Sequence, residues 1–366
     1  MPALPVIVTV SNNGLGKKKT FDCNFKMVHR RSKFLSNFLN IKRHGTSSCI
    51  PLKVLNLRNI STSMKMSDSG TPKEIIIPIP SGHIAGKVWN EGGIPFVGLH
   101  GWMDNAGTWD KLAPLLPKNV SLISIDLPGH GLSSHRPSGT SHHFSNLLLV
   151  IERVVQHFGL SEVNLLAHSM SSGASILYAG TFPEKVKKVI MIDLIKPISV
   201  DATDQPLKTA QGIGDLLALE SKIGRLPPRY EFNDMVDKMV KSYGDSLSEE
   251  AAKILLKRGS TKHADGLYSF NYDPQLKARN IFGMTFEQQK AFANRIQCEL
   301  LLIKCSNGPL YESMEMYNEM LSIYEKKAKK YIYKIVEGSH HVHLNNAEIV
   351  APILCEFMQN NDSLVS

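Results

Sequence analysis

The sequence predicts an α/β fold in which a mostly parallel sheet is covered by helices on both faces. From residue 74 onward, short apolar runs of strand length alternate with amphipathic helical stretches, an alternation that is typical of parallel sheets. The alternation stops between about residues 199 and 292, where the sequence is helical and polar without clear strands. We therefore expect a core formed by 72–198 and 293–360, and a helical cap formed by the insertion 199–292.

The expected strands are short runs of large apolar residues. A first pair, 74–80 and 83–89, is separated by Ser81-Gly82, a typical turn dipeptide. The later strands are expected at 95–99, 121–125, 163–166, 189–192, 299–304 and 331–336. Helical periodicity predicts helices at 144–158, 172–181 and 347–358. Strands and helices thus follow one another in the order that a parallel sheet requires.

The basic charge of the chain lies in an N-terminal extension, residues 1–71, and not in the expected core. Residues 1–66 hold 12 of the 42 Lys and Arg side chains and one of the 33 acidic side chains. The rest of the chain is therefore almost neutral. A nucleic-acid groove needs basic charge on the folded domain, so we expect no nucleic-acid partner.

The composition of this extension is that of an organelle transit segment, and residues 30–39 can form a short basic amphipathic helix. Two other interpretations stay open, a disordered tail and a start of translation at Met64 or Met66. We expect an intracellular protein, cytoplasmic or, if the extension is a transit peptide, mitochondrial. No apolar run has the length of a transmembrane helix. The five irregularly spaced cysteines indicate reduced thiols.

Ser169 is the candidate nucleophile because it lies between an expected strand and an expected helix. A sharp strand-to-helix turn exposes such a side chain above the sheet. The usual pattern is Gly-x-Ser-x-Gly, whereas Ala167 and Ser171 occupy the two glycine positions here. A serine in such a loop is often only a helix cap, so the prediction depends on other parts of the sequence.

Two further segments that directly follow expected strands favour a catalytic serine. In His100-Gly101-Trp102, the Trp102 backbone N–H can bind a developing oxyanion, and the Met170 N–H can supply a second donor. A tight turn is the alternative explanation of this segment. Residues 126–131 form a turn rich in glycine, and for them we expect a structural role without chemistry.

A dense histidine cluster, His340, His341 and His343, follows the last expected strand. A histidine at this place can reach a serine far away in the sequence, and the order serine, acid, histidine fits. Such a cluster can instead bind a metal ion. No Cys or Asp motif accompanies it, and we therefore expect neither a metal ion nor another cofactor.

Across residues 72–358 these motifs resemble the α/β-hydrolase superfamily and, within it, the serine hydrolase-like proteins of the kraken type. The resemblance is carried by residues 100–105, Trp109, 126–131, 168–170, 268–274 and 338–344. It implies Ser169 as nucleophile and His340 as base, with His343 packed nearby and His341 pointing away from the site. A serine at this turn implies an acyl-enzyme path on an ester, thioester or related small acyl substrate, without metal or organic cofactor.

The triad acid is the least determined residue of the site. Its common place in the superfamily follows the strand that ends near Lys304, but residues 305–309 contain no acid. We predict Asp193, which follows the preceding strand, a location that some members of the superfamily use. Glu312 is a weaker alternative, and Asn307 can orient the histidine without supplying charge.

The sequence thus predicts a serine hydrolase of the carboxylic-ester type with a nucleophile elbow and a cap domain. Ser171 and Ser172 stand where the resemblance implies two glycines, and each adds a side chain to a tight turn. The alternative is therefore a catalytically weak or inactive binding protein with the same fold. An acyltransferase that needs no cofactor is a third possibility.

Overall fold

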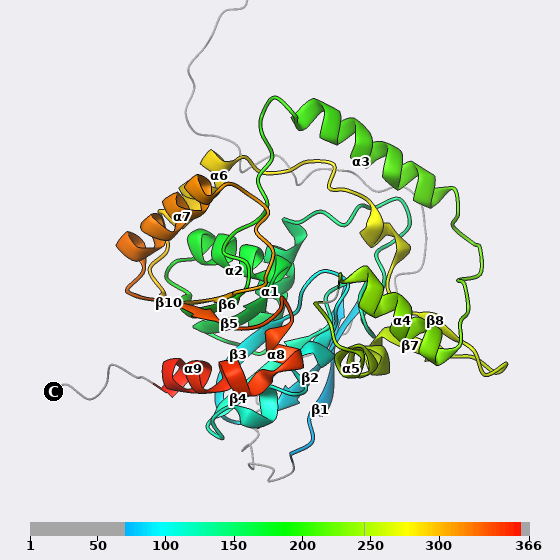
Figure 1. Cartoon of the computed structure of the whole chain (residues 1–366), viewed down its shortest axis with the longest axis horizontal. Coiled ribbons are helices and arrows are strands. Elements are labelled where there is room, and N and C mark those ends of the chain that lie inside the picture. The colour runs from blue at the N-terminus through cyan, green and yellow to red at the C-terminus, as the bar shows by residue number, and fades with distance from the viewer. Residues whose placement is uncertain (1–69, 245, 360–366) are drawn as a thin grey trace, which may run out of the picture. The chain divides into compact units, whose positions relative to one another are not determined.

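A computed structural model describes residues 70–359 except residue 245. The predictions for residues 1–69, including the transit segment, the alternative start sites, Cys23 and Cys49, lie outside the described residues. The central element is an eight-stranded sheet with the strand order β1-β2-β4-β3-β5-β6-β9-β10 (Figure 1). Its strands are β1 Lys73–Ile79, β2 Gly82–Trp89, β3 Ile94–Leu99, β4 Val120–Ile125, β5 Val163–His168, β6 Val186–Ile192, β9 Glu299–Cys305 and β10 Lys330–Val336.

The sheet is mostly parallel, which confirms the predicted fold class. Only β2 pairs antiparallel, with β1 on one side and β4 on the other, among the strands of this sheet. The remaining neighbours pair in parallel. All eight expected strands are present, with boundaries that differ by a few residues. Because parallel strands share a direction, their carboxyl ends meet at one edge of the sheet.

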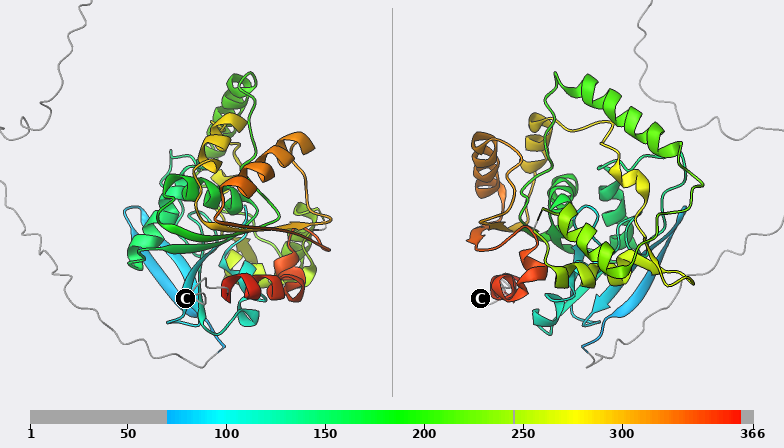
Figure 2. Two further views of the ribbon diagram at one scale, coloured as in Figure 1. Left: turned by 90° about the vertical axis from the view of Figure 1, so that its left-hand side faces the viewer. Right: turned by 45° about the vertical axis from the view of Figure 1, so that its right-hand side comes forward.

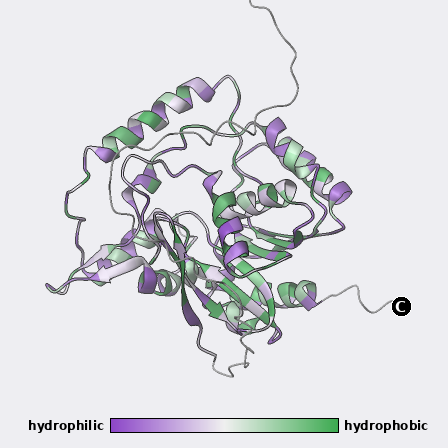
Figure 3. Cartoon of the chain, turned by 180° about the vertical axis from the view of Figure 1, so that it is seen from behind, coloured by the Kyte–Doolittle hydropathy of each residue, from purple (hydrophilic) through white to green (hydrophobic). Residues whose placement is uncertain are grey.

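Helices cover both faces of the sheet. One face carries α1 Asn146–His157, α2 Met170–Thr181, α6 Phe286–Ala293 and α7 Met314–Lys327, and the other carries α8 Val342–Asn345 and α9 Ala347–Gln359. The left view of Figure 2 shows the orange α7 above the sheet and the red α9 below it. Separate apolar clusters fill the two faces. In Figure 3 the central strands are accordingly hydrophobic, while the outer helices carry hydrophilic stripes.

The expected insertion contains helices, but it also contains a small hairpin. The helices are α3 Gln205–Glu220, α4 Phe232–Ser242 and α5 Glu249–Gly259, and the hairpin pairs β7 Ser260–Lys262 with β8 Tyr268–Phe270. The prediction of an insertion without strands was wrong, because three-residue strands are too short to produce a recognisable alternation. The helices α4 and α5 enclose their own apolar cluster, which Leu344 joins from α8.

Helix α6 lies within the expected insertion but packs against α2 of the core. Gly180 permits this contact, because a Cβ there would lie 2.3 Å from the backbone oxygen of Phe292. Short 3₁₀ helices complete the fold: η1 Ala106–Trp109, η2 Ala113–Leu115 and η3 Pro274–Lys277. None of the helices in the described part of the chain has the length and hydrophobicity needed to span a membrane.

Candidate active site

Ser169 occupies a strained turn between β5 and α2, as the sequence predicts. Its backbone has φ 52° and ψ −122°, a conformation that residues other than glycine rarely adopt. The Ser169 N–H donates to the carbonyl oxygen of Ile192 at 3.0 Å, which ties the turn to the end of the neighbouring strand β6. This geometry is that of a nucleophile elbow.

The two serines that replace glycine in the elbow are both buried and both hydrogen-bonded. Ser171 Oγ donates to the carbonyl oxygen of His100 at 2.5 Å, and Ser172 Oγ donates to that of Ala167 at 3.1 Å. Neither hydroxyl therefore carries the cost of an unpaired buried polar group. The glycine that the elbow does require is Gly173, where a Cβ would lie 2.7 Å from a backbone nitrogen of a neighbouring loop.

The structure brings the three predicted triad residues into one hydrogen-bonded chain. Ser169 Oγ lies 2.8 Å from His340 Nε2, and His340 Nδ1 donates to Asp193 Oδ2 at 2.6 Å. The three residues come from the ends of β5, β6 and β10. Because those ends meet at one edge of the sheet, residues up to 171 positions apart in the sequence become neighbours.

Asp193 is held by more than the histidine. Its Oδ1 accepts from the Cys305 N–H at 2.8 Å and from Lys304 Nζ at 2.6 Å. Burial alone would raise the pKa of Asp193, but the hydrogen bonds from His340 and Lys304 outweigh burial, and the pKa is lowered. Asp193 is therefore a carboxylate that can orient the His340 ring and stabilise its protonated form.

Gly308 packs directly against this carboxylate, since a Cβ there would lie 2.0 Å from Asp193 Oδ2.

The two alternatives predicted for the triad acid, Glu312 and Asn307, make other contacts. Glu312 accepts from the Ser199 N–H and forms an ion pair with Lys196. The Asn307 side chain lines the cavity described below but makes no hydrogen bond to His340 among the described residues.

Of the two backbone donors predicted for an oxyanion, Met170 directly follows Ser169, and Trp102 lines the same cavity as Ser169. Met170 opens α2, so its N–H has no partner within the helix. Trp102 lies in the turn after β3, which the buried His100 ring holds in place. His100 Nδ1 donates to the Gly101 carbonyl oxygen at 2.7 Å, and its Nε2 accepts from the Leu127 N–H at 2.9 Å.

Asp126 has a structural role, as expected. It accepts from the backbone N–H groups of Ala106 at 2.7 Å and Leu132 at 3.0 Å. It also binds the guanidinium of Arg258, which comes from α5 and reaches Glu74 with its third nitrogen. Asp126 therefore fastens the insertion to the core sheet.

Ser169 and His340 line a cavity of about 750 Å³ between the core and the insertion. That volume lies in the range of small-molecule sites. Core residues and residues of α4 and the β8 hairpin both contribute to its wall. Its lining includes Gly101, Trp102, Ser169, His340, Tyr230, Lys238, Met239, Tyr243, Phe270, Tyr272, Lys277 and Tyr311. The wall is thus rich in aromatic side chains, among them Trp102, and it also contains two lysines, Lys238 and Lys277.

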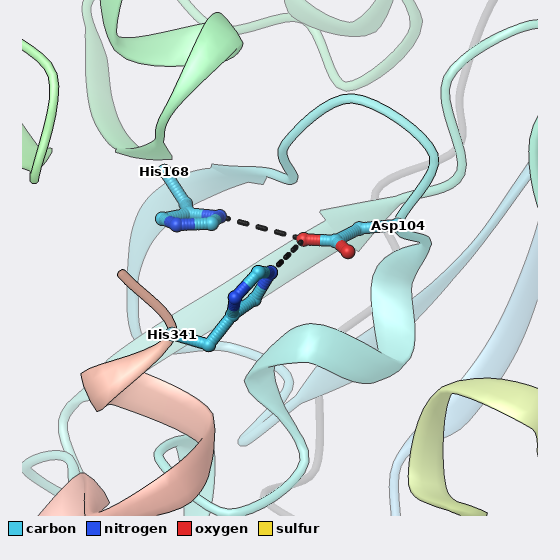
Figure 4. Close-up of side chains that lie close together, drawn as sticks. All are labelled: Asp104, His168 and His341. Atoms are coloured by element: carbon cyan, nitrogen blue, oxygen red, sulfur yellow. Dashed lines mark ion pairs between the residues drawn. The ribbon is translucent and has the colours of Figure 1, made fainter. Parts of the chain in front are cut away.

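Asp104, for which we predicted no role, is surrounded by the other histidines of the site. Its Oδ2 lies 3.4 Å from His168 Nδ1 and 3.5 Å from His341 Nε2 (Figure 4). The expectation that His341 points away was wrong, because the insertion covers that side and the ring lines the cavity. The premise that no acid accompanies the cluster was also wrong, since Asp104 comes from a distant loop. His343 packs nearby as expected, with its ring centroid 4.2 Å from that of His168.

Comparisons with known proteins support the same architecture. A family model described as alpha/beta hydrolase fold matches residues 94–279. A probable serine hydrolase of Drosophila melanogaster is 32% identical, over 78% of this chain and 88% of the relative. Serine hydrolase-like protein 2 of Homo sapiens is 33% identical, over 80% of this chain and 97% of the relative. A solved hypothetical protein of Pseudomonas aeruginosa superimposes with a TM-score of 0.71 at 28% identity, over 78% of this chain and 99% of that one.

Proposed function

Because the chain belongs to the α/β-hydrolase family, as its motifs predicted, we propose that it cleaves an ester, thioester or related acyl substrate through an acyl-enzyme intermediate. The observation that carries the proposal is the hydrogen-bonded chain from Ser169 through His340 to Asp193, which opens into the cavity. A nucleophile, a base within hydrogen-bond reach and a group that orients the base are the parts that acyl transfer needs.

In the first half of the reaction, Ser169 Oγ attacks the acyl carbonyl carbon while His340 Nε2 takes its proton. Asp193 holds the Nδ1–H and stabilises the imidazolium that forms. The carbonyl oxygen becomes an oxyanion, which the N–H groups of Trp102 and Met170 bind. The intermediate then collapses, and His340 gives its proton to the departing alcohol or thiol. Water, activated by His340, releases the acid in the second half.

The packing of Ser171 and Ser172 supports a working elbow over the inactive alternative. Both hydroxyls bond to backbone carbonyls without displacing the Ser169 turn. The Ser171 bond also joins the elbow to the segment that carries the Trp102 N–H. Two donors held in place before the reaction contribute several powers of ten in rate.

A fluorophosphonate probe tests the proposal, because it reacts with activated serines. We expect the full-length protein to be labelled and the Ser169→Ala variant to be unlabelled. Ser175→Ala is a matched control, since Ser175 is a buried serine of α2, the helix that follows Ser169, and it should label normally. A folded protein that is not labelled would instead be a binding protein. Product analysis with an added alcohol separates hydrolysis from acyl transfer to that alcohol.

The intracellular location predicted from residues 1–71 stays a proposal, with the cytoplasm and the mitochondrion as its two forms. Its basis is the basic, acid-poor composition of that segment. N-terminal sequencing of the protein isolated from its native cells tests it: a mature end inside the segment or after it, other than at Met64 or Met66, supports import into an organelle, and a retained segment contradicts it.

A further inference from the structure

Three buried polar atoms face one another beside the triad. They are Asp104 Oδ2, His168 Nδ1 and His341 Nε2, and they lie within 4.8 Å of one another. All three residues are 1% exposed. Among the described residues, Asp104 Oδ2 and His168 Nδ1 have no hydrogen-bond partner. Figure 4 shows the two rings directed at the same carboxylate oxygen. Unpaired buried polar atoms are costly, so their convergence calls for an explanation.

The tautomer of His168 makes the arrangement unfavourable without a cation. His168 Nε2 lies 2.9 Å from the carbonyl oxygen of His340, which can only accept, so Nε2 carries the proton. A neutral imidazole carries a single ring proton, so Nδ1 of His168 has none. Nδ1 then directs a lone pair at Asp104 Oδ2, 3.4 Å away. Two acceptors at that distance repel each other unless a positive charge lies between them.

The outer contacts of the three residues are those found around metal ligands. Ligating histidines use their second nitrogen for a hydrogen bond, and ligating carboxylates are hydrogen-bonded in turn. His168 donates to a backbone carbonyl, and His341 Nδ1 lies 3.0 Å from Ser246 Oγ. Asp104 Oδ1 accepts from the Tyr243 hydroxyl at 2.9 Å. In each residue, one atom is held by the protein and the other faces the common centre.

The spacing fits a tetrahedral ion. Zinc binds His nitrogen and Asp oxygen at about 2.0–2.2 Å, which places tetrahedral ligand atoms about 3.3–3.6 Å apart, whereas an octahedral ion needs about 3.0 Å. The distances from Asp104 Oδ2 to His168 Nδ1, 3.4 Å, and to His341 Nε2, 3.5 Å, match the tetrahedral value. Gly101 leaves room beside them, because a Cβ there would lie 2.9 Å from His168 Nδ1 and 3.2 Å from Asp104 Oδ2.

We propose that Asp104, His168 and His341 form a binding site for a divalent transition-metal ion, with zinc as the ion that best suits two imidazoles and one carboxylate. All three residues line the cavity that contains Ser169, so an ion can enter from it. With three protein ligands, a tetrahedral ion keeps a fourth position for water or a donor atom of a bound molecule. The site is separate from the triad and does not depend on the proposed hydrolase function.

Metal binding is tested on the full-length protein after treatment with EDTA and desalting. Titration with Co²⁺ should produce the visible absorption of tetrahedral cobalt, and calorimetry with Zn²⁺ should give one site per chain. Asp104→Asn and His341→Gln should weaken the affinity by more than 100-fold, which exceeds the usual effect of outer contacts. Tyr243→Phe keeps all three ligands but removes the hydrogen bond to Asp104, and it should weaken binding by about tenfold.

Two controls make the result specific. His157→Gln removes an exposed histidine of α1 and should bind like the wild type. Ser169→Ala should also bind normally, so the metal site can stand even if the hydrolase proposal fails. The proposal is overturned if zinc does not bind at tens of micromolar. It is equally overturned if binding persists at full strength in both Asp104→Asn and His341→Gln, because other groups would then hold the ion.

Discussion

The contact between Gly308 and Asp193 predicts that one added methyl group disables the site. Gly308→Ala would place a Cβ 2.0 Å from Asp193 Oδ2 and 2.2 Å from Oδ1, while real Cβ contacts are at least 3.0 Å. The carboxylate or the loop must therefore move by about 1 Å, the scale on which misplacement of a reacting group costs about 100-fold in rate. Three hydrogen bonds to His340, Lys304 and Cys305 fix the carboxylate, so it cannot turn aside freely.

We expect kcat/KM of Gly308→Ala for p-nitrophenyl butyrate to fall by about 100-fold, or about 2.7 kcal/mol of transition-state stabilisation. The fluorophosphonate labelling rate should fall in parallel. The upper bound is the loss of a triad acid, about 10⁴-fold in kcat. A thermal unfolding curve must show that the variant is folded, because a lower rate from unfolded protein would prove nothing about the triad.

Gly214→Ala is the matched control, since this glycine lies in α3 and a Cβ there meets nothing within 4 Å. It should keep the wild-type rate and be as stable or slightly more stable, because alanine favours a helix by about 1 kcal/mol over glycine. If Gly308→Ala keeps more than about a third of the wild-type kcat/KM, the approach of Gly308 to Asp193 does not constrain the triad, and the reasoning is refuted.

Three further predictions concern the charges of the site. Asp193→Asn should lower kcat by about 10⁴-fold while the Ser169 side chain stays in place, as steady-state kinetics will show. Lys304→Met removes a partner that lowers the pKa of Asp193; its destabilisation in urea unfolding should be largest at pH 7 and shrink as falling pH protonates Asp193. His168 is buried with its pKa lowered from 6.5 to about 4, so neutral burial contributes stability that is present above pH 6.5 and lost as pH falls toward 4. The wild type should therefore lose about 3 kcal/mol more than His168→Gln over that interval; equal slopes would contradict the prediction.

The sequence was sufficient to predict that Ser169, Asp193 and His340 lie together, because of the way parallel strands are arranged. Asp193 directly follows an expected strand, and Ser169 and His340 follow theirs within four residues. The carboxyl ends of such strands share one edge of the sheet. Strand prediction and chain order therefore bring the three residues together without any knowledge of distances. This reasoning uses only the order of strands and residues along the chain. Errors of a few residues in the expected strand ends therefore did not change which residues were predicted to lie together.

The residues that the sequence did not reveal depend on contacts between loops. Gly308 is required only because the Asp193 carboxylate lies against it, and nothing local to residues 305–309 indicates that contact. Asp104 likewise meets His341 across 237 positions of the chain. His341 was expected to point away because the sequence could not show that the insertion covers that side of the loop. Loop residues carry no periodic signal, so their direction is decided by tertiary packing alone.

The insertion is part of the site's support as well as the wall of its cavity. Tyr243, which follows α4, bonds to Asp104, and Ser246 bonds to His341. Asp104 lies two residues after Trp102, and His341 adjoins His340, so the insertion holds the two loops that carry the proposed oxyanion donor and the proposed base. A change in the position of the insertion must therefore act on both loops at once. Substitutions such as Tyr243→Phe should consequently lower kcat even for small esters that do not reach the insertion, whereas a wall with only a binding role would change KM alone.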